Sequence, residues 1–315
     1  MILQKDLVIQ LFPHCNLNCD FCYLDRKIKK DKLEYIDLCI QSIKKNKLKS
    51  NSVEMWGGEI FYDNSSDYLK KMIELLELLN PQHLTIHTNL VFNIESNLLL
   101  SYIEEREINL TLYTSYDPEG RFKNQAQLDL FLSNVEKITN KLFFFSNGKL
   151  EISTVLTEKL LLGKCDLSVL DSLYKNENCR LIFYLNYNGY ESEEIKSNPS
   201  YILDFIARYP KCQNVLLLNE NRNSPNRWCL CNNTVQLRYE LDFEPQINKQ
   251  CMTTEDFIKI KELWEIKHNC SNCKFNNYCK DVCIGAIVKS GIINQESCYR
   301  KLMYKRFYPI KVINV

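Results

Sequence analysis

Short runs of β-type residues alternate with longer amphipathic stretches from Leu7 to about Leu218. This alternation is typical of a parallel sheet wrapped by helices. The runs expected to form strands are Leu7–Phe12, Ser52–Trp56, His83–Thr88, Asn109–Thr114, Glu151–Val155 and Arg180–Leu185. The stretches expected to form helices are Tyr35–Lys45, Tyr68–Leu79, Leu98–Glu105, Gln127–Thr139 and Leu167–Tyr174, with a further segment at Asn198–Arg208.

The stretch Tyr68–Leu79 shows the helical spacing well. Its apolar residues recur at intervals of three and four, whereas Lys70, Lys71 and Glu74 face the other way. Six strand–helix repeats are fewer than the eight of a closed TIM barrel. We therefore expect an α/β fold, a partial (β/α)6 TIM-type barrel, with its active site at the carboxyl ends of the strands.

Three cysteines directly follow the first expected strand. Cys15, Cys19 and Cys22 have the spacing C-x3-C-x2-C, one thiolate short of a closed tetrahedral metal site or a fully ligated iron–sulfur cube. They are suited to hold three corners of a [4Fe–4S] cluster and to leave the fourth iron open for a ligand. The alternative is a structural zinc loop that lacks one ligand.

A Gly-Gly-Glu sequence, Gly57-Gly58-Glu59, follows the second expected strand. Two adjacent glycines allow unusual backbone angles and a close approach of a ligand to the main chain. The Glu59 carboxylate is then available to accept hydrogen bonds from an ammonium group. Alone, such a sequence is more often an ordinary turn.

The cysteine content is high for a protein without export signals. We find no signal peptide at the N-terminus and no run of eighteen apolar residues, so we expect a cytoplasmic protein without a membrane span. Its 15 cysteines should not form stable disulfides there. The 40 basic and 39 acidic residues give no reason to expect a nucleic-acid or anionic-membrane partner.

Eight of the fifteen cysteines lie between Cys229 and Cys298, which indicates a second metal-binding module. Cys270, Cys273, Cys279 and Cys283 have the spacing C-x2-C-x5-C-x3-C, and Cys298 follows. A zinc knuckle is the alternative to iron–sulfur ligation here. Cys39, Cys165, Cys179 and Cys212 remain, and their apolar neighbours favour buried thiols.

The cysteine loop and the Gly-Gly-Glu sequence together resemble the radical S-adenosylmethionine (radical SAM) superfamily. The resemblance implies that Cys15, Cys19 and Cys22 bind the catalytic [4Fe–4S] cluster, and that Gly57, Gly58 and Glu59 hold the methionyl amine of S-adenosylmethionine. Such enzymes cleave this cofactor to methionine and a 5′-deoxyadenosyl radical, which abstracts a substrate hydrogen.

Further residues match the family by position. Tyr23 matches an aromatic that packs near the adenine, and Thr88 with Asn89 resembles the Thr-Asn-Gly of the third strand, with Leu90 in place of the glycine. Ser115 resembles the serine of the Ser-x-Asp motif, which helps to bind the methionyl carboxylate or the ribose. Arg121 is a candidate to neutralise that carboxylate, and it is as readily an ordinary surface arginine. Asn186, at the end of the sixth strand, corresponds to adenine contacts.

The C-terminal spacing resembles the SPASM extension of radical SAM enzymes. By that resemblance, Cys270, Cys273, Cys279 and Cys298 hold one auxiliary [4Fe–4S] cluster, and Cys283 joins Cys229, Cys231 and Cys251 on the other. The tight Cys229–Cys231 pair departs from the family pattern and leaves this second ligand set open. His14 directly precedes Cys15, and His268 lies two residues before Cys270. Either could bind a cluster or donate a hydrogen bond to its sulfur, but a local structural role is the simpler interpretation. The expected domains are 1–218 for the radical SAM barrel and 219–315 for the SPASM-like domain.

The resemblance implies an enzyme that modifies a peptide or protein side chain, by oxidation or by a thioether or carbon–carbon cross-link. The alternatives are sulfatase-type oxidation of Ser or Cys, a small-molecule substrate, and a non-catalytic iron–sulfur electron carrier. Met252 follows Cys251 where sulfatase-maturing enzymes typically have an aspartate. The expected partners are the peptide, with or without a separate leader-binding protein, and a flavodoxin- or ferredoxin-type electron donor. The residue that moves the substrate proton is unknown.

Overall fold

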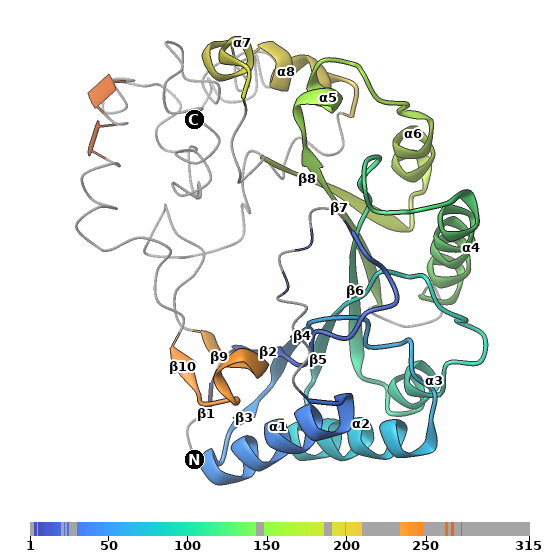
Figure 1. The fold of residues 1–315 in the computed structure, drawn as a ribbon, viewed down its shortest axis with the longest axis vertical. Coiled ribbons are helices and arrows are strands. Elements are labelled where there is room, and N and C mark those ends of the chain that lie inside the picture. The colour runs from blue at the N-terminus through green and yellow to red at the C-terminus, as the bar shows by residue number, and fades with distance from the viewer. Residues whose placement is uncertain are drawn as a thin grey trace, which may run out of the picture. The chain divides into compact units, whose positions relative to one another are not determined.

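The structure of the protein is a computed structural model that describes residues 3–4, 6–19, 22, 24, 30–142, 148–185, 191–198, 200–209, 234–247, 262–263, 266–267 and 272. Its main feature is a sheet with the strand order β10-β9-β2-β4-β5-β6-β7-β8 (Figure 1). The strands are β2 (Asp6–Gln10), β4 (Ser52–Trp56), β5 (His83–His87), β6 (Asn109–Ser115), β7 (Lys149–Leu156), β8 (Cys179–Leu185), β9 (Thr234–Arg238) and β10 (Gln246–Ile247). A separate parallel pair joins β1 (Leu3–Gln4) to β3 (Lys49–Ser50).

Helices connect successive strands, as in a chain of β-α repeats. They are α1 (Lys32–Asn46), α2 (Ser66–Leu79), α3 (Leu98–Glu105), α4 (Gln125–Leu142), α5 (Glu158–Leu161), α6 (Ser168–Lys175), α7 (Glu193–Ser197) and α8 (Ser200–Ala207), with a short 3₁₀ turn η2 (Tyr239–Leu241). Asp31 caps α1 and Asn97 caps α3 by accepting a main-chain N–H of the first turn. Among the described residues, no helix is both long and apolar enough to cross a membrane.

The six strands expected from the sequence are β2, β4, β5, β6, β7 and β8, and they are neighbours in that order. Along β4, Val53 and Met55 are buried, whereas Glu54 and its neighbours on the same face are partly exposed. Leu84 and Ile86 of β5 repeat this pattern. Successive side chains of a strand point to opposite faces of the sheet, which explains the alternation. Helices α1 to α3 lie beside these strands (Figure 1).

Two features differ from the sequence prediction. A separate helix, α7, precedes the expected segment Asn198–Arg208, which forms the helix α8, and Ile195 of α7 is fully buried. Strand β9 pairs in parallel with β2, and β10 pairs antiparallel with β9, so residues beyond 218 extend the sheet. The boundary expected at 218/219 lies outside the described residues.

By its contacts the chain divides into two compact units. The first contains Met1–Ser153, Ser172–Arg180 and Asn233–Asn248, and the second contains Thr154–Asp171, Leu181–Asn232 and Lys249–Val315. Every residue of the site described below belongs to the first unit. In the second unit, the rings of Phe183, Phe205 and Tyr209 pack within 5.3 Å of one another, measured between centroids.

Candidate functional site

The candidate site lies at the carboxyl ends of four neighbouring parallel strands. The cysteine loop follows β2, Gly57-Gly58-Glu59 follows β4, Thr88 and Asn89 follow β5, and Ser115 ends β6 shortly before Arg121. Strands that run in the same direction bring their carboxyl ends to one edge of the sheet. The structure therefore brings together segments that are far apart in the sequence.

Gly57 and Gly58 lie where the segment leading into the cysteine loop contacts the end of β4. The Gly58 N–H donates to the Phe12 carbonyl at 2.6 Å, and the Glu59 N–H donates to the His14 carbonyl at 2.8 Å. A Cβ atom on Gly58 would lie 1.6 Å from the His14 carbonyl oxygen, and one on Gly57 would lie 2.5 Å from the Phe12 carbonyl oxygen. The glycines are thus needed to admit the main chain that leads into the cysteines, whereas the sequence suggested room for a ligand.

Glu59 is a buried carboxylate, with only 1% of its surface exposed. It accepts hydrogen bonds from the Thr88 hydroxyl at 2.8 Å, the Phe61 N–H at 3.0 Å and the Asn89 N–H at 2.5 Å. Burial raises the pKa of Glu59, while these hydrogen bonds and the charge of Arg121 act in the opposite direction. A carboxylate accepts about four hydrogen bonds, so one position remains for a further donor.

Thr88 and Asn89 connect this carboxylate to the cysteine loop. The Asn89 side-chain amide donates to Asn16 Oδ1 at 2.6 Å and lies 3.5 Å from Cys15 Sγ. Asn89 was noticed in the sequence only as part of a Thr-Asn pair, and no role was assigned to it. Leu90 has a φ of 57°, in the left-handed region that favours glycine, the residue that the family's Thr-Asn-Gly has at this place.

Arg121 is buried, with 6% of its surface exposed, which excludes the surface-arginine interpretation. Its guanidinium donates to Ser115 Oγ at 2.5 Å and to Thr114 Oγ1 at 3.4 Å, while its Nε has no hydrogen-bond partner among the described residues. Burial lowers the pKa of Arg121, and the charges of Cys19 and Glu59 oppose this. Within the described residues it forms no ion pair, so it is a buried cation that lacks a direct counter-anion.

The three cysteines of the loop are accessible: Cys15 is exposed and the other two are half-buried. The Leu17 N–H donates to Cys15 Sγ at 3.4 Å, and Cys19 Sγ lies 3.8 Å from the Arg121 carbonyl oxygen. No three His, Cys, Asp or Glu side chains of the described part converge on one metal ion.

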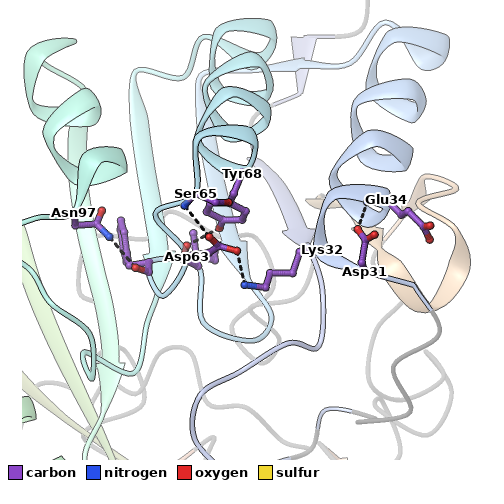
Figure 2. Close-up of polar contacts among 9 residues, drawn as sticks. Asp31, Lys32, Glu34, Asp63, Ser65, Tyr68 and Asn97 are labelled. Atoms are coloured by element: carbon purple, nitrogen blue, oxygen red, sulfur yellow. Dashed lines mark hydrogen bonds and ion pairs between the residues drawn. The ribbon is translucent and has the colours of Figure 1, made fainter.

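The loops behind the site are held by a polar network (Figure 2). Lys32 Nζ donates to Asp63 at 2.8 Å and lies 5.7 Å and 5.6 Å from the ring centres of Tyr62 and Tyr68. The Asn97 amide donates to the Phe61 carbonyl at 2.8 Å. These contacts join the start of α1, the loop after Glu59 and the start of α3, and so support the position of the glutamate.

Several expected site residues lie outside the described residues: Tyr23, Asn186 and the eight C-terminal cysteines Cys229, Cys231, Cys251, Cys270, Cys273, Cys279, Cys283 and Cys298, as do His268 and Cys212. Their assignments stay predictions. His14 is half-buried, its Nδ1 has no partner, and burial lowers its pKa. Cys39 is fully buried, while Cys165 and Cys179 are partly buried.

No family model and no curated protein matches the chain. Among solved structures, it is similar to one described as native anSMEcpe with bound AdoMet (S-adenosylmethionine) and Cp18Cys peptide. The two have 18% sequence identity and a TM-score of 0.58, and the match covers 98% of each chain. That protein is an anaerobic sulfatase-maturating enzyme of the radical SAM class. The similarity confirms the predicted α/β fold, a partial TIM-type barrel, which the chain shares with that structure.

Proposed function

We propose that this protein is a radical SAM enzyme that modifies a side chain of a peptide or protein. The observation that carries the proposal is the pairing of two buried opposite charges beside the cysteine loop. Within the described part of the chain, Glu59 has one remaining acceptor position and the Arg121 Nε–H has no partner. An amino-acid zwitterion matches this pair, with its ammonium group toward Glu59 and its carboxylate toward Arg121.

The methionyl part of S-adenosylmethionine is such a zwitterion. Cys15, Cys19 and Cys22 would hold a [4Fe–4S] cluster with an open iron, and Ser115, which already receives a hydrogen bond from Arg121, would orient the guanidinium. Together the cluster and the cofactor supply a 5′-deoxyadenosyl radical that removes a hydrogen atom from the substrate. The protein's own contribution is to position the cofactor and to exclude water from the buried charges.

The C-terminal cysteines would hold two auxiliary [4Fe–4S] clusters in a SPASM-like domain at 219–315, which follows the barrel at 1–218 in the sequence. Cys270, Cys273, Cys279 and Cys298 would bind one cluster, and Cys229, Cys231, Cys251 and Cys283 the other. Tyr23 and Asn186 would contact the adenine. An external flavodoxin- or ferredoxin-type protein would reduce the catalytic cluster, and a separate protein is the candidate for binding a leader peptide.

The likeness to a structure with a bound Cp18Cys peptide supports a peptide substrate. Because of this likeness, oxidation of a Cys or Ser side chain is as well supported as cross-linking, although Met252 stands where sulfatase-maturing enzymes place an aspartate. The two outcomes differ chemically. Oxidation of this kind creates a carbonyl, whereas a thioether or carbon–carbon cross-link joins two side chains without one.

Iron content and product chemistry test this function. The anaerobically reconstituted chain should contain about twelve irons, and the triple variant Cys15→Ala/Cys19→Ala/Cys22→Ala about eight. About four irons together with zinc in the wild type would remove the auxiliary-cluster assignment. Peptides incubated with the reduced enzyme and S-adenosylmethionine should then be treated with a carbonyl-trapping hydrazine and analysed by mass spectrometry. A trapped adduct identifies oxidation, and an untrapped product that resists thiol alkylation identifies a thioether.

A further inference from the structure

We infer that Asn89 tunes the reduction potential of the cluster at Cys15 by donating a hydrogen bond to the cysteine sulfur. This inference rests on the proposed function, since it requires a cluster at the cysteine loop. Asn89 acts through Cys15 and is therefore a positioning residue. The supporting observations are the orientation of its amide, the number of its donors and its burial.

The orientation of the Asn89 amide follows from its neighbours. The Val91 N–H donates to Asn89 Oδ1 at 2.7 Å. A main-chain N–H is only a donor, so the atom that faces it must be the amide oxygen. The amide nitrogen then faces Cys15, and the assignment of nitrogen and oxygen is fixed by chemistry.

The amide nitrogen carries two hydrogens, and the structure provides two acceptors for them. One acceptor is Asn16 Oδ1 at 2.6 Å, and the other is Cys15 Sγ at 3.5 Å. Asn16 is held in turn by its own amide, which donates to the Val91 carbonyl at 2.5 Å. Both Asn89 donors are thus committed to the cysteine loop.

Asn89 is also anchored at its main chain. Its N–H donates to Glu59, the residue proposed to hold the cofactor amine, and only 8% of its surface is exposed. Its side chain and main chain therefore contact the cluster ligand and the cofactor ligand at once. Asn89 thus links Cys15 directly to Glu59 and fixes the distance between these two residues.

A hydrogen bond to a cluster thiolate favours the reduced state, because reduction adds negative charge that the donor dipole stabilises. Asn89 should therefore make the catalytic cluster easier to reduce. Cys15 has a second donor in the Leu17 N–H, so removal of Asn89 weakens the hydrogen bonding at this sulfur without abolishing it.

The test is a potentiometric titration of the reconstituted full-length protein by electron paramagnetic resonance. The catalytic cluster is identified as the one whose signal changes when S-adenosylmethionine is added. Asn89→Ala removes both amide donors and keeps the main-chain N–H to Glu59. Asn89→Ser keeps an oxygen near the Val91 N–H, in case the alanine variant fails to fold, and is too short to reach Cys15.

Asn134→Ala is the matched control. Asn134 is a buried asparagine that donates to the carbonyls of Leu90 and Phe92 at 2.9 and 2.7 Å, so it holds the same loop without touching a cysteine. Both Asn89 variants should shift the midpoint potential of the S-adenosylmethionine-sensitive cluster to more negative values, and the control should not. An unchanged potential in the Asn89 variants, or an equal shift in the control, overturns the inference. A wild-type protein without any S-adenosylmethionine-sensitive signal overturns the proposed function itself, and this inference with it.

Discussion

Replacing Gly58 by alanine should displace the cysteine loop from β4. The added Cβ would lie 1.6 Å from the His14 carbonyl oxygen and 2.9 Å from the His14 nitrogen, and both are main-chain atoms with little freedom to move. The loop must shift, and the hydrogen bonds Gly58 N–H to Phe12 O and Glu59 N–H to His14 O are lost or distorted.

The cost follows from two contributions. Each main-chain hydrogen bond contributes about 1 kcal/mol, and forcing an extra carbon into a packed site costs about 1 to 3 kcal/mol. We therefore expect Gly58→Ala to lower the free energy of unfolding by about 3 to 5 kcal/mol. Domains typically have about 5 to 15 kcal/mol in total, so the effect is readily measured.

Urea unfolding followed by circular dichroism, together with iron analysis, is the appropriate assay. Gly163→Ala is the control, because a Cβ at Gly163 meets no atom within 4 Å, so the only cost there comes from the positive φ of 68°. The control should lose about 1 kcal/mol and no iron. Gly58→Ala should bind about four fewer irons per chain. A Gly58→Ala protein as stable as the control, with a full iron content, would refute the structural role given to this glycine.

Three further predictions concern the neighbouring residues. Arg121→Met should weaken S-adenosylmethionine binding by about tenfold or more in calorimetry, because it removes the cation proposed to face the cofactor carboxylate; an unchanged affinity would contradict this. In urea unfolding, Leu90→Gly should lower the free energy of unfolding by about 1 kcal/mol less than Leu90→Ala does, because residue 90 has a positive φ. Glycine is usually the more destabilising of the two, so a more stable alanine variant would argue against this. Burial tends to raise the pKa of Asp63, but hydrogen bonds from Lys32 and Ser65 outweigh it and lower that pKa. The Lys32–Asp63 pair therefore stabilises the protein above pH 3.8, the ordinary pKa of Asp63, and this stabilisation is lost as the pH falls below that value. Asp63→Asn should lower the free energy of unfolding by about 1 kcal/mol or less, and the difference from wild type should shrink at acid pH. A difference independent of pH would count against the pair.

The elements around the site were predictable because their patterns are local. The run Ser52–Trp56 coincides with β4, and Leu98–Glu105 coincides with α3, since alternation and helical spacing are strong in both. The cysteine spacing also predicted an open site after the first strand, and the parallel order of strands placed Glu59 beside it.

The remaining features depend on contacts between distant parts of the chain. The Thr88-Asn89 pair marks this position in the sequence, but only the fold brings Asn89 to Cys15, which lies 74 residues earlier. The burial of Arg121 and the contact of Gly58 with His14 are likewise tertiary. Strand β9 was missed because it is a short run far from its partner β2 in the sequence, so no local period marks it.

We propose that the cysteine loop (Cys15, Cys19 and Cys22), together with the buried charges of Glu59 and Arg121, generates a 5′-deoxyadenosyl radical from S-adenosylmethionine. The most direct measurement is the yield of 5′-deoxyadenosine from S-adenosylmethionine, by liquid chromatography, after anaerobic reduction of the reconstituted protein. The wild type and a Cys165→Ser control, which alters a cysteine outside the loop, should both form it, whereas Cys19→Ala should not. A wild type with intact clusters that forms no 5′-deoxyadenosine, or a Cys19→Ala variant that forms as much, would contradict the claim.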